Sequence, residues 1–271
     1  MDAARASLRQ HWQEYLIEAA GLGVFMVVAG ICVMLLEQPG SPLHQAIASP
    51  ELRRALIGVA MGLTAIALIY SPWGRQSGAH LNPAVTLSFL RLGKVAPADA
   101  LFYVAAQFAG GTAGTLLLSV FFGGRFTLPP ISAVATLPGR PGEFVALAAE
   151  IAIAFVMMAT VLTANASARL MRWTGLCAGI LVALYIAIEA PLSGMSLNPA
   201  RSVASAVPSG VWQGIWIYLI ASPLGMLLAA ELHLRLGHRT PCAKLDHFTQ
   251  RRCIFHCEFA GMPATEASHE R

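Results

Sequence analysis

The sequence is poor in charged residues. Only 12% of its 271 residues are Asp, Glu, Lys or Arg, whereas a soluble domain of this size carries about 25%. Apolar residues make up 56% of the chain, and its mean hydropathy is +0.62. Because a bilayer penalises every buried charge, this balance indicates a membrane protein rather than a soluble domain.

Features of two other protein classes are missing as well. The net charge of +4 and a pI near 9.0 could suit a nucleic-acid-binding protein, but the basic residues form no stripe. They lie in short polar connections and in the tail, which is typical of membrane proteins. The apolar segments hold no nucleophile–base pair and no catalytic metal constellation, so we expect neither an enzyme, nor a cofactor, nor a nucleic-acid partner.

Long apolar runs dominate the chain. About 20 apolar residues are needed to cross a bilayer, and six segments qualify: roughly 15–36, 55–71, 98–122, 143–164, 174–192 and 211–235. No convincing cleavage site follows the first, so we interpret it as a retained helix. We expect a leader at 1–14, a membrane domain at 15–240 with halves at about 15–122 and 143–235, and a tail at 241–271.

Two shorter apolar stretches, at about 82–91 and 198–207, cannot cross the bilayer, and each begins at an Asn-Pro pair. One pair is Asn82-Pro83 in SGAHLNPAVTL, and the other is Asn198-Pro199 in SLNPARSV. They follow the second and the fifth span, so they occupy equivalent places in two halves of three spans. Such matching interruptions indicate an inverted repeat, in which the halves have opposite orientations and both termini lie on one side.

Basic residues indicate which side that is. The side of the termini carries Arg5, Arg9, Arg75, Arg91, Lys94, Arg169, Arg172 and six more after Leu234. The opposite side carries Arg53, Arg54, Arg125, Arg140 and Arg201. The excess of positive charge predicts that both termini are cytoplasmic.

An Asn-Pro pair suits a helix that begins inside a membrane. The Asn oxygen caps the first turn, and Pro at the next position has no N–H to leave unpaired. If the two short helices meet, their positive ends and two amide donors face one space, which disfavours cations and hydrated protons. The irregular backbone before each helix should offer carbonyl acceptors to a neutral solute. These carbonyls belong to Gly78, Ala79, His80, Leu81, Gly194, Met195 and Leu197.

SGAHLNPAVT and SLNPARS resemble the two signature loops of the aquaporin, or major intrinsic protein, family, and the resemblance covers about residues 15 to 235. It implies an all-α membrane fold of six transmembrane helices and two re-entrant half-helices, one pore per subunit, and homotetramers in the plasma (inner) membrane. It also implies passage of water and, in some branches, glycerol or other small neutral solutes. The expected pore midplane comprises Asn82, Pro83, Ala84, Asn198, Pro199 and Ala200.

The resemblance also assigns roles to buried polar residues. Glu18 and Glu150 lie in the first spans of the two halves and are expected to hold the loops beside the pore, with Gln107 packing nearby. His80 is expected at the cytoplasmic mouth, and Arg201 at the outer constriction.

The other constriction positions are expected to be Ile186, Ser196 or alternatively Met195, and Met61 rather than Gly62. This ring lacks the His of strict water channels and the two aromatic residues of glycerol facilitators. It predicts a wider, apolar gate for water and small uncharged solutes. One alternative is a channel mainly for glycerol, urea or a metalloid hydroxide. Another is a secondary transporter, which would need Glu18 or Glu150 on the solute path.

The tail carries a cluster of metal-ligating residue types. Three thiolates and one imidazole, from Cys242, His247, Cys253 and Cys257, could form a tetrahedral zinc site in a reducing compartment. The spacing matches no standard CxxC pair. The alternatives are an unstructured basic tail with incidental cysteines, or a palmitoylated anchor.

Overall fold

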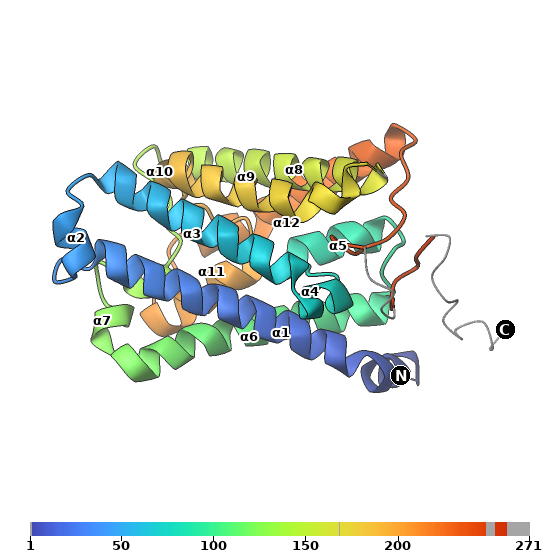
Figure 1. Cartoon of the computed structure of the whole chain (residues 1–271), viewed down its shortest axis with the longest axis horizontal. Coiled ribbons are helices and arrows are strands. Elements are labelled where there is room, and N and C mark those ends of the chain that lie inside the picture. Colours follow the sequence, from blue (N-terminus) through green and yellow to red (C-terminus); the bar gives the residue numbers. More distant parts are fainter. Residues whose placement is uncertain (1, 168, 248–252, 259–271) are drawn as a thin grey trace.

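The computed structural model describes residues 2–167, 169–247 and 253–258, and this part of the chain contains helices but no strands. Six of its helices are long and apolar enough to cross a membrane. They are α1 (Asp2–Glu37), α3 (Pro50–Tyr70), α6 (Pro97–Phe122), α8 (Glu143–Ala166), α9 (Thr174–Ile188) taken together with the 3₁₀ turn that precedes it, and α12 (Ile215–Arg235). They run side by side in one elongated bundle, with the start of α1 and the tail after α12 at the same end (Figure 1). The predicted fold class is confirmed.

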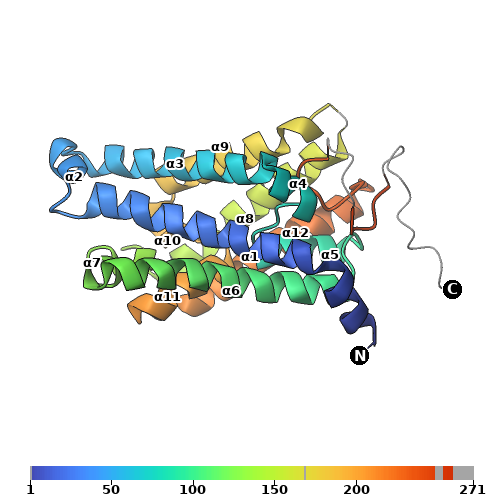
Figure 2. The same ribbon diagram turned by 60° about the horizontal axis from the view of Figure 1, so that its bottom comes forward.

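Two short helices begin inside the bundle. α5 (Pro83–Arg91) extends toward the end that holds the tail, and α11 (Pro199–Ser209) extends toward the opposite end (Figures 1 and 2). Each follows an irregular loop that is itself preceded by a short helix, α4 (Pro72–Ser77) or α10 (Ala190–Ser193). We call these segments the first loop (residues 78–82) and the second loop (residues 194–198). The remaining short elements, at the bundle ends, are α2 (Pro42–Ala46), α7 (Gly124–Thr127) and two 3₁₀ turns at Ser132–Val134 and Met171–Trp173.

The helices pair in the pattern of an inverted repeat. α1 packs along α6 and α8 along α12, which are equivalent pairs in the two halves, whereas α3 packs along α9 between the halves. Small residues permit these close approaches. A Cβ added at Gly62 would lie 2.5 Å from the carbonyl oxygen of Gly179, and one at Gly110 would lie 2.0 Å from that of Ala19.

The first helix is longer than the apolar run predicted. α1 starts at Asp2 and continues through the polar leader, because one face of that leader is docked on α6. Ser7, His11 and Tyr15 all donate hydrogen bonds to the buried carboxylate of Asp99, with distances of 2.8 Å from His11 and 2.6 Å from Tyr15. Hydropathy alone did not reveal this polar contact.

Candidate functional site

The two half-helices begin with the same cap. The side-chain oxygen of Asn82 accepts a hydrogen bond from the N–H of Ala84 at 2.9 Å. That of Asn198 accepts from Ala200 at 3.0 Å and from Arg201 at 3.3 Å. A Pro occupies the first turn of each helix. The capping oxygen fixes each carboxamide so that its NH₂ group points away from its own helix.

The two carboxamides also join the loops. Asn82 Nδ2 donates to the carbonyl of Leu197 at 2.8 Å, and Asn198 Nδ2 donates to the carbonyl of Leu81 at 2.8 Å. Each NH₂ group has two hydrogens, so one is used in this reciprocal pair and the other is left for a solute. Sequence analysis did not foresee the pair. It means that the positive ends of α5 and α11 meet at one place in the bundle.

A buried carboxylate supports the first loop. Glu18 accepts hydrogen bonds from the backbone N–H groups of His80 at 3.1 Å and Leu81 at 2.6 Å. It also accepts from Ser77 Oγ at 2.7 Å and from Gln107 Nε2 at 2.8 Å. These four donors occupy the carboxylate oxygens, so the carboxylate stabilises the conformation of the first loop.

Glu150 does the same for the second loop. It accepts from the N–H groups of Ser196 at 2.6 Å and Leu197 at 2.8 Å, and from Ser193 Oγ at 2.8 Å. Neither Glu150 nor Glu18 is among the residues that line the central cavity. The two acids therefore have equivalent positions behind the loops rather than on a solute path.

Sequence analysis missed a matching pair of tyrosines. Tyr103 Oη donates to the carbonyl of Ser77, and Tyr218 Oη to that of Ser193, each at 2.6 Å. Both rings are fully buried. The two tyrosines occupy equivalent places in α6 and α12, so a comparison of the third spans of the two halves would have revealed them.

The loops hold an unusual backbone. Ala79, Leu81, Met195 and Leu197 all have φ between 49° and 58°, a left-handed region that residues with a Cβ rarely adopt. The hydrogen bonds to the two carboxylates offset this strain.

Three of the expected acceptor carbonyls already have a protein donor. The carbonyls of Leu81 and Leu197 accept from the two carboxamides, and that of Gly78 accepts from the N–H of Leu245 at 3.2 Å.

A central cavity of about 560 Å³ passes this junction. It extends from Pro50 and Arg54 at one end, past Asn82 and Asn198, to Leu245 of the tail. The expected constriction residues all line it: Met61, Ile186, Met195, Ser196 and Arg201.

Two of these positions differ in what they offer a solute. The hydroxyl of Ser196 donates to the carbonyl of Asn198 at 3.0 Å and lies 2.5 Å from Ser202 Oγ, so the loop itself uses it. Arg201 Nη1 donates to Thr136 Oγ1, which holds one side of the guanidinium in place. Met61 lines the cavity, whereas Gly62 is not among the lining residues.

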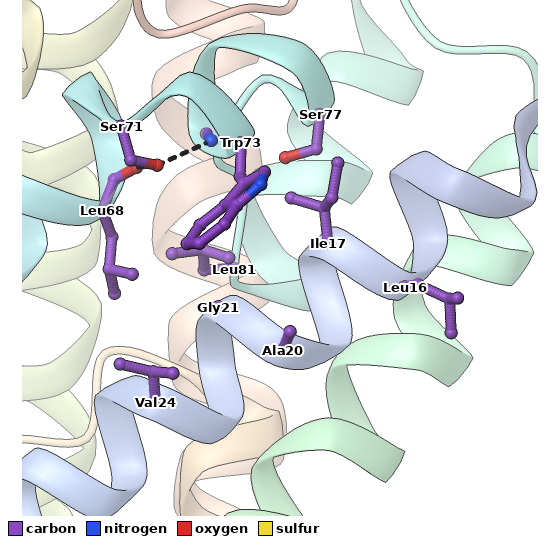
Figure 3. Close-up of a pocket in the computed structure, with 11 residues that line it drawn as sticks. Leu16, Ile17, Ala20, Gly21, Val24, Leu68, Ser71, Trp73, Ser77 and Leu81 are labelled. Atoms are coloured by element: carbon purple, nitrogen blue, oxygen red, sulfur yellow. Dashed lines mark hydrogen bonds between the residues drawn. The ribbon is translucent and has the colours of Figure 1, made fainter.

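A second pocket lies on the flank of the bundle, between α1 and the segment from the end of α3 through α4 (Figure 3). Its lining is almost wholly apolar, including Leu16, Leu68 and Trp73. Its two hydroxyls are already engaged, since Ser71 accepts from Gly74 N–H and Ser77 donates to Glu18. This lining offers a polar solute few hydrogen-bond partners, so the central cavity remains the candidate path.

Comparison with known proteins gives a family. The model of the major intrinsic protein family matches residues 5–233. Aquaporin NIP2-3 of Zea mays is 37% identical over 200 residues, 73% of this chain and 64% of the relative. Aquaporin NIP1-4 of Oryza sativa subsp. japonica is 35% identical over 188 residues, which are 68% of this chain and 67% of the relative. The chain thus matches about two thirds of the length of these relatives.

A solved structure has the same fold. The aquaglyceroporin from Plasmodium falciparum superposes with a TM-score of 0.65 at 20% identity, covering 83% of this chain and 96% of that one. The likeness in structure agrees in fold, and the family match over most of its length shows that the chain belongs to the major intrinsic protein family.

Proposed function

We propose that this protein is a passive transmembrane channel for water and small uncharged solutes that excludes protons and ions. The observation that carries the proposal is the junction of α5 and α11 on the central cavity, where Asn82 and Asn198 each present an amide hydrogen. Two helix N-termini make this place electropositive. A neutral molecule with a lone pair is bound there, and a cation is repelled. Relatives named as aquaporins agree with this function.

The two buried acids on which the transporter alternative depends do not support it, and Glu37, an acid that does line the cavity, is paired with Arg53. Coupling to an ion gradient requires an ionisable group on the path. Glu18 and Glu150 are held by loop donors and do not line the cavity. We propose no enzymatic activity either, in keeping with the family.

For solute preference, we propose water together with small uncharged solutes of the size of glycerol. Met61 and Ile186 line the cavity with Arg201 and present apolar walls where an imidazole would add a donor and narrow the passage. Ser196 and Met195 both line the cavity, and we keep Ser196 as the fourth constriction position, with Met195 as the alternative. A channel mainly for glycerol, urea or a metalloid hydroxide is the second candidate, because the same apolar ring disfavours strict selection for water.

Four finer points of the assignment are also proposals: the side of the termini, the membrane, the oligomeric state and the domain boundaries. The excess of basic residues on the side of the termini supports a cytoplasmic location for both. We place the protein in the plasma (inner) membrane as a homotetramer. Exposed apolar side chains on the outer helices, such as Val120 at 82% and Phe121 at 73% exposure, suit contact with lipid or with another subunit. The domain boundaries at 14 and 240 remain proposals too.

For the tail we propose a zinc ion, while the membrane domain needs no cofactor. One ligand atom from each of Cys242, His247, Cys253 and Cys257 lies within 4.8 Å of every other. Thiolates and imidazole are the ligands zinc prefers.

Swelling and shrinkage of proteoliposomes test the channel. The purified chain should accelerate osmotic shrinkage with a low temperature dependence and without ion current, and the assay should be run with and without a zinc chelator. Ile186→His should reduce glycerol and urea flux more than water flux, and Ile186→Val should leave the ratio near that of the wild type. Saturating flux that depends on a sodium or proton gradient would refute the channel and favour the transporter.

A further inference from the structure

We propose that zinc at Cys242, His247, Cys253 and Cys257 locks the tail over the mouth of the cavity on the side of the termini and thereby closes the channel. This inference rests on the channel function proposed above. It assigns a regulatory metal site to a segment outside the family match, which ends at residue 233.

The first observation is the geometry of the cluster. Zinc bonds of about 2.3 Å to sulfur and 2.0–2.1 Å to nitrogen give tetrahedral edges of about 3.8 Å between two sulfurs and about 3.6 Å between sulfur and nitrogen. Cys242 Sγ and Cys253 Sγ are 3.5 Å apart, and Cys257 Sγ and His247 Nε2 are 3.6 Å apart. A disulfide requires about 2.05 Å, so the two thiols are not joined.

The second observation is where the tail sits. Leu245 lines the cavity and is 5% exposed, and its N–H donates to the carbonyl of Gly78 at 3.2 Å. Two residues earlier, the carbonyl of Ala243 accepts from His80 Nε2 at 2.9 Å. Gly78 and His80 belong to the mouth that sequence analysis expected to offer hydrogen bonds to the solute. The tail takes these groups and places an apolar side chain on the wall of the cavity at this mouth.

Further contacts hold the same segment down. Arg75 Nε donates to Asp246 Oδ2 at 2.6 Å, and Asn165 Nδ2 donates to the carbonyl of Lys244 at 3.1 Å. The ring of Phe255 stacks on that of His80, with centroids 5.3 Å apart and 15° between the planes. We call the described tail residues 240–247 and 253–258 the plug.

The third observation is the way the cluster joins the plug. Cys242 and His247 flank the residues that enter the mouth, and Cys253 and Cys257 flank Phe255. The described plug contains no helix or strand, so its shape depends on a few isolated backbone hydrogen bonds and on side-chain contacts. A four-ligand metal bond stabilises such a segment far more than any one of its hydrogen bonds. Loss of the metal should therefore release Leu245 from the cavity.

The test uses the full chain in proteoliposomes under a phosphine reductant, with zinc content and osmotic water permeability measured on the same sample. The wild type should hold about one zinc per chain. A membrane-permeable chelator should remove it and raise water permeability at least threefold, and added zinc should restore the low value.

Two variants separate the metal from the plug. Cys253→Ser should lose the zinc and remain permeable with or without added zinc. Leu245→Ala should keep the zinc but stay permeable when it is bound. Cys177→Ser, in α9 and away from the cluster, is the matched control and should behave as the wild type does.

Four outcomes would overturn the inference: no zinc under reducing conditions, bound zinc without a change in permeability, low permeability in Leu245→Ala with zinc bound, or closure by an oxidant in the absence of metal. The last would assign the effect to a Cys242–Cys253 disulfide. If zinc binds but no sample conducts water in either state, the proposed channel function fails instead, and the two failures are thus distinguishable.

Discussion

The substitution Glu150→Gln isolates what a buried acid contributes to the second loop. It keeps the size of the side chain but replaces one oxygen with an NH₂ group. All three partners of Glu150 donate to it: Ser193 Oγ, and the N–H groups of Ser196 and Leu197. In the better orientation, the new NH₂ faces Leu197 and leaves that N–H without an acceptor.

The expected magnitude follows from these contacts. One buried donor left unsatisfied costs about 1–3 kcal/mol, and two hydrogen bonds that lose a charged acceptor weaken by about 1 kcal/mol each. The sum is about 3–5 kcal/mol. For a chain of this size, such a loss lowers Tm by roughly 6–20 °C. Because Leu197 also accepts from Asn82, the loop should shift at the junction, and we expect severalfold lower water permeability.

The assay is thermal unfolding of the purified protein in detergent, followed by water flux in proteoliposomes. Glu143→Gln is the matched control, since Glu143 is exposed in the first turn of the same helix, and it should change neither quantity. Equal Tm values for the two variants would refute the argument that the carboxylate holds the loop.

Three further predictions concern the junction, the charge and the packing. Asn82→Ala removes a helix cap worth about 1 kcal/mol and a hydrogen bond worth about 1 kcal/mol, so Tm and water permeability should both fall; unchanged values would contradict the geometry of the junction. Arg201→Val should permit a cation current in planar bilayers that the wild type lacks. A variant that carries no cation current would show that the charge of Arg201 is not the barrier to cations. Gly62→Ala places a Cβ 2.5 Å from the Gly179 oxygen and should cost about 1–3 kcal/mol of stability in detergent, whereas Gly40→Ala, with open space around it, should cost little.

Most of the helix arrangement could be predicted because its signals are local. An apolar run of sufficient length predicts a span, and Asn before Pro predicts a helix start, whatever the rest of the chain does. The observed half-helices begin at Pro83 and Pro199, next to those signals. The expected fifth span, in contrast, ends at Ile188, and the separate α10 follows. Hydropathy does not distinguish one helix from two short ones in the same apolar run.

The site was harder to predict from the sequence because its contacts join distant parts of the chain. Motifs pointed to Asn82 and Asn198, but the carbonyls that receive their amide hydrogens depend on how two loops meet in space. The same holds for the tail. Its cysteines and histidine indicated a metal, but nothing in their spacing indicated that Ala243 and Leu245 would contact the first loop.

The reciprocal bonds between Asn82 and Leu197 and between Asn198 and Leu81 also bear on biosynthesis. A ribosome completes the first three spans before the second loop exists. Until then, the carboxamide of Asn82 has no carbonyl to receive its hydrogen, and the backbone carbonyl of Leu81 has no donor. The junction therefore cannot form until the second half is translated, whereas Glu18 and Tyr103 of the first half can already hold the first loop.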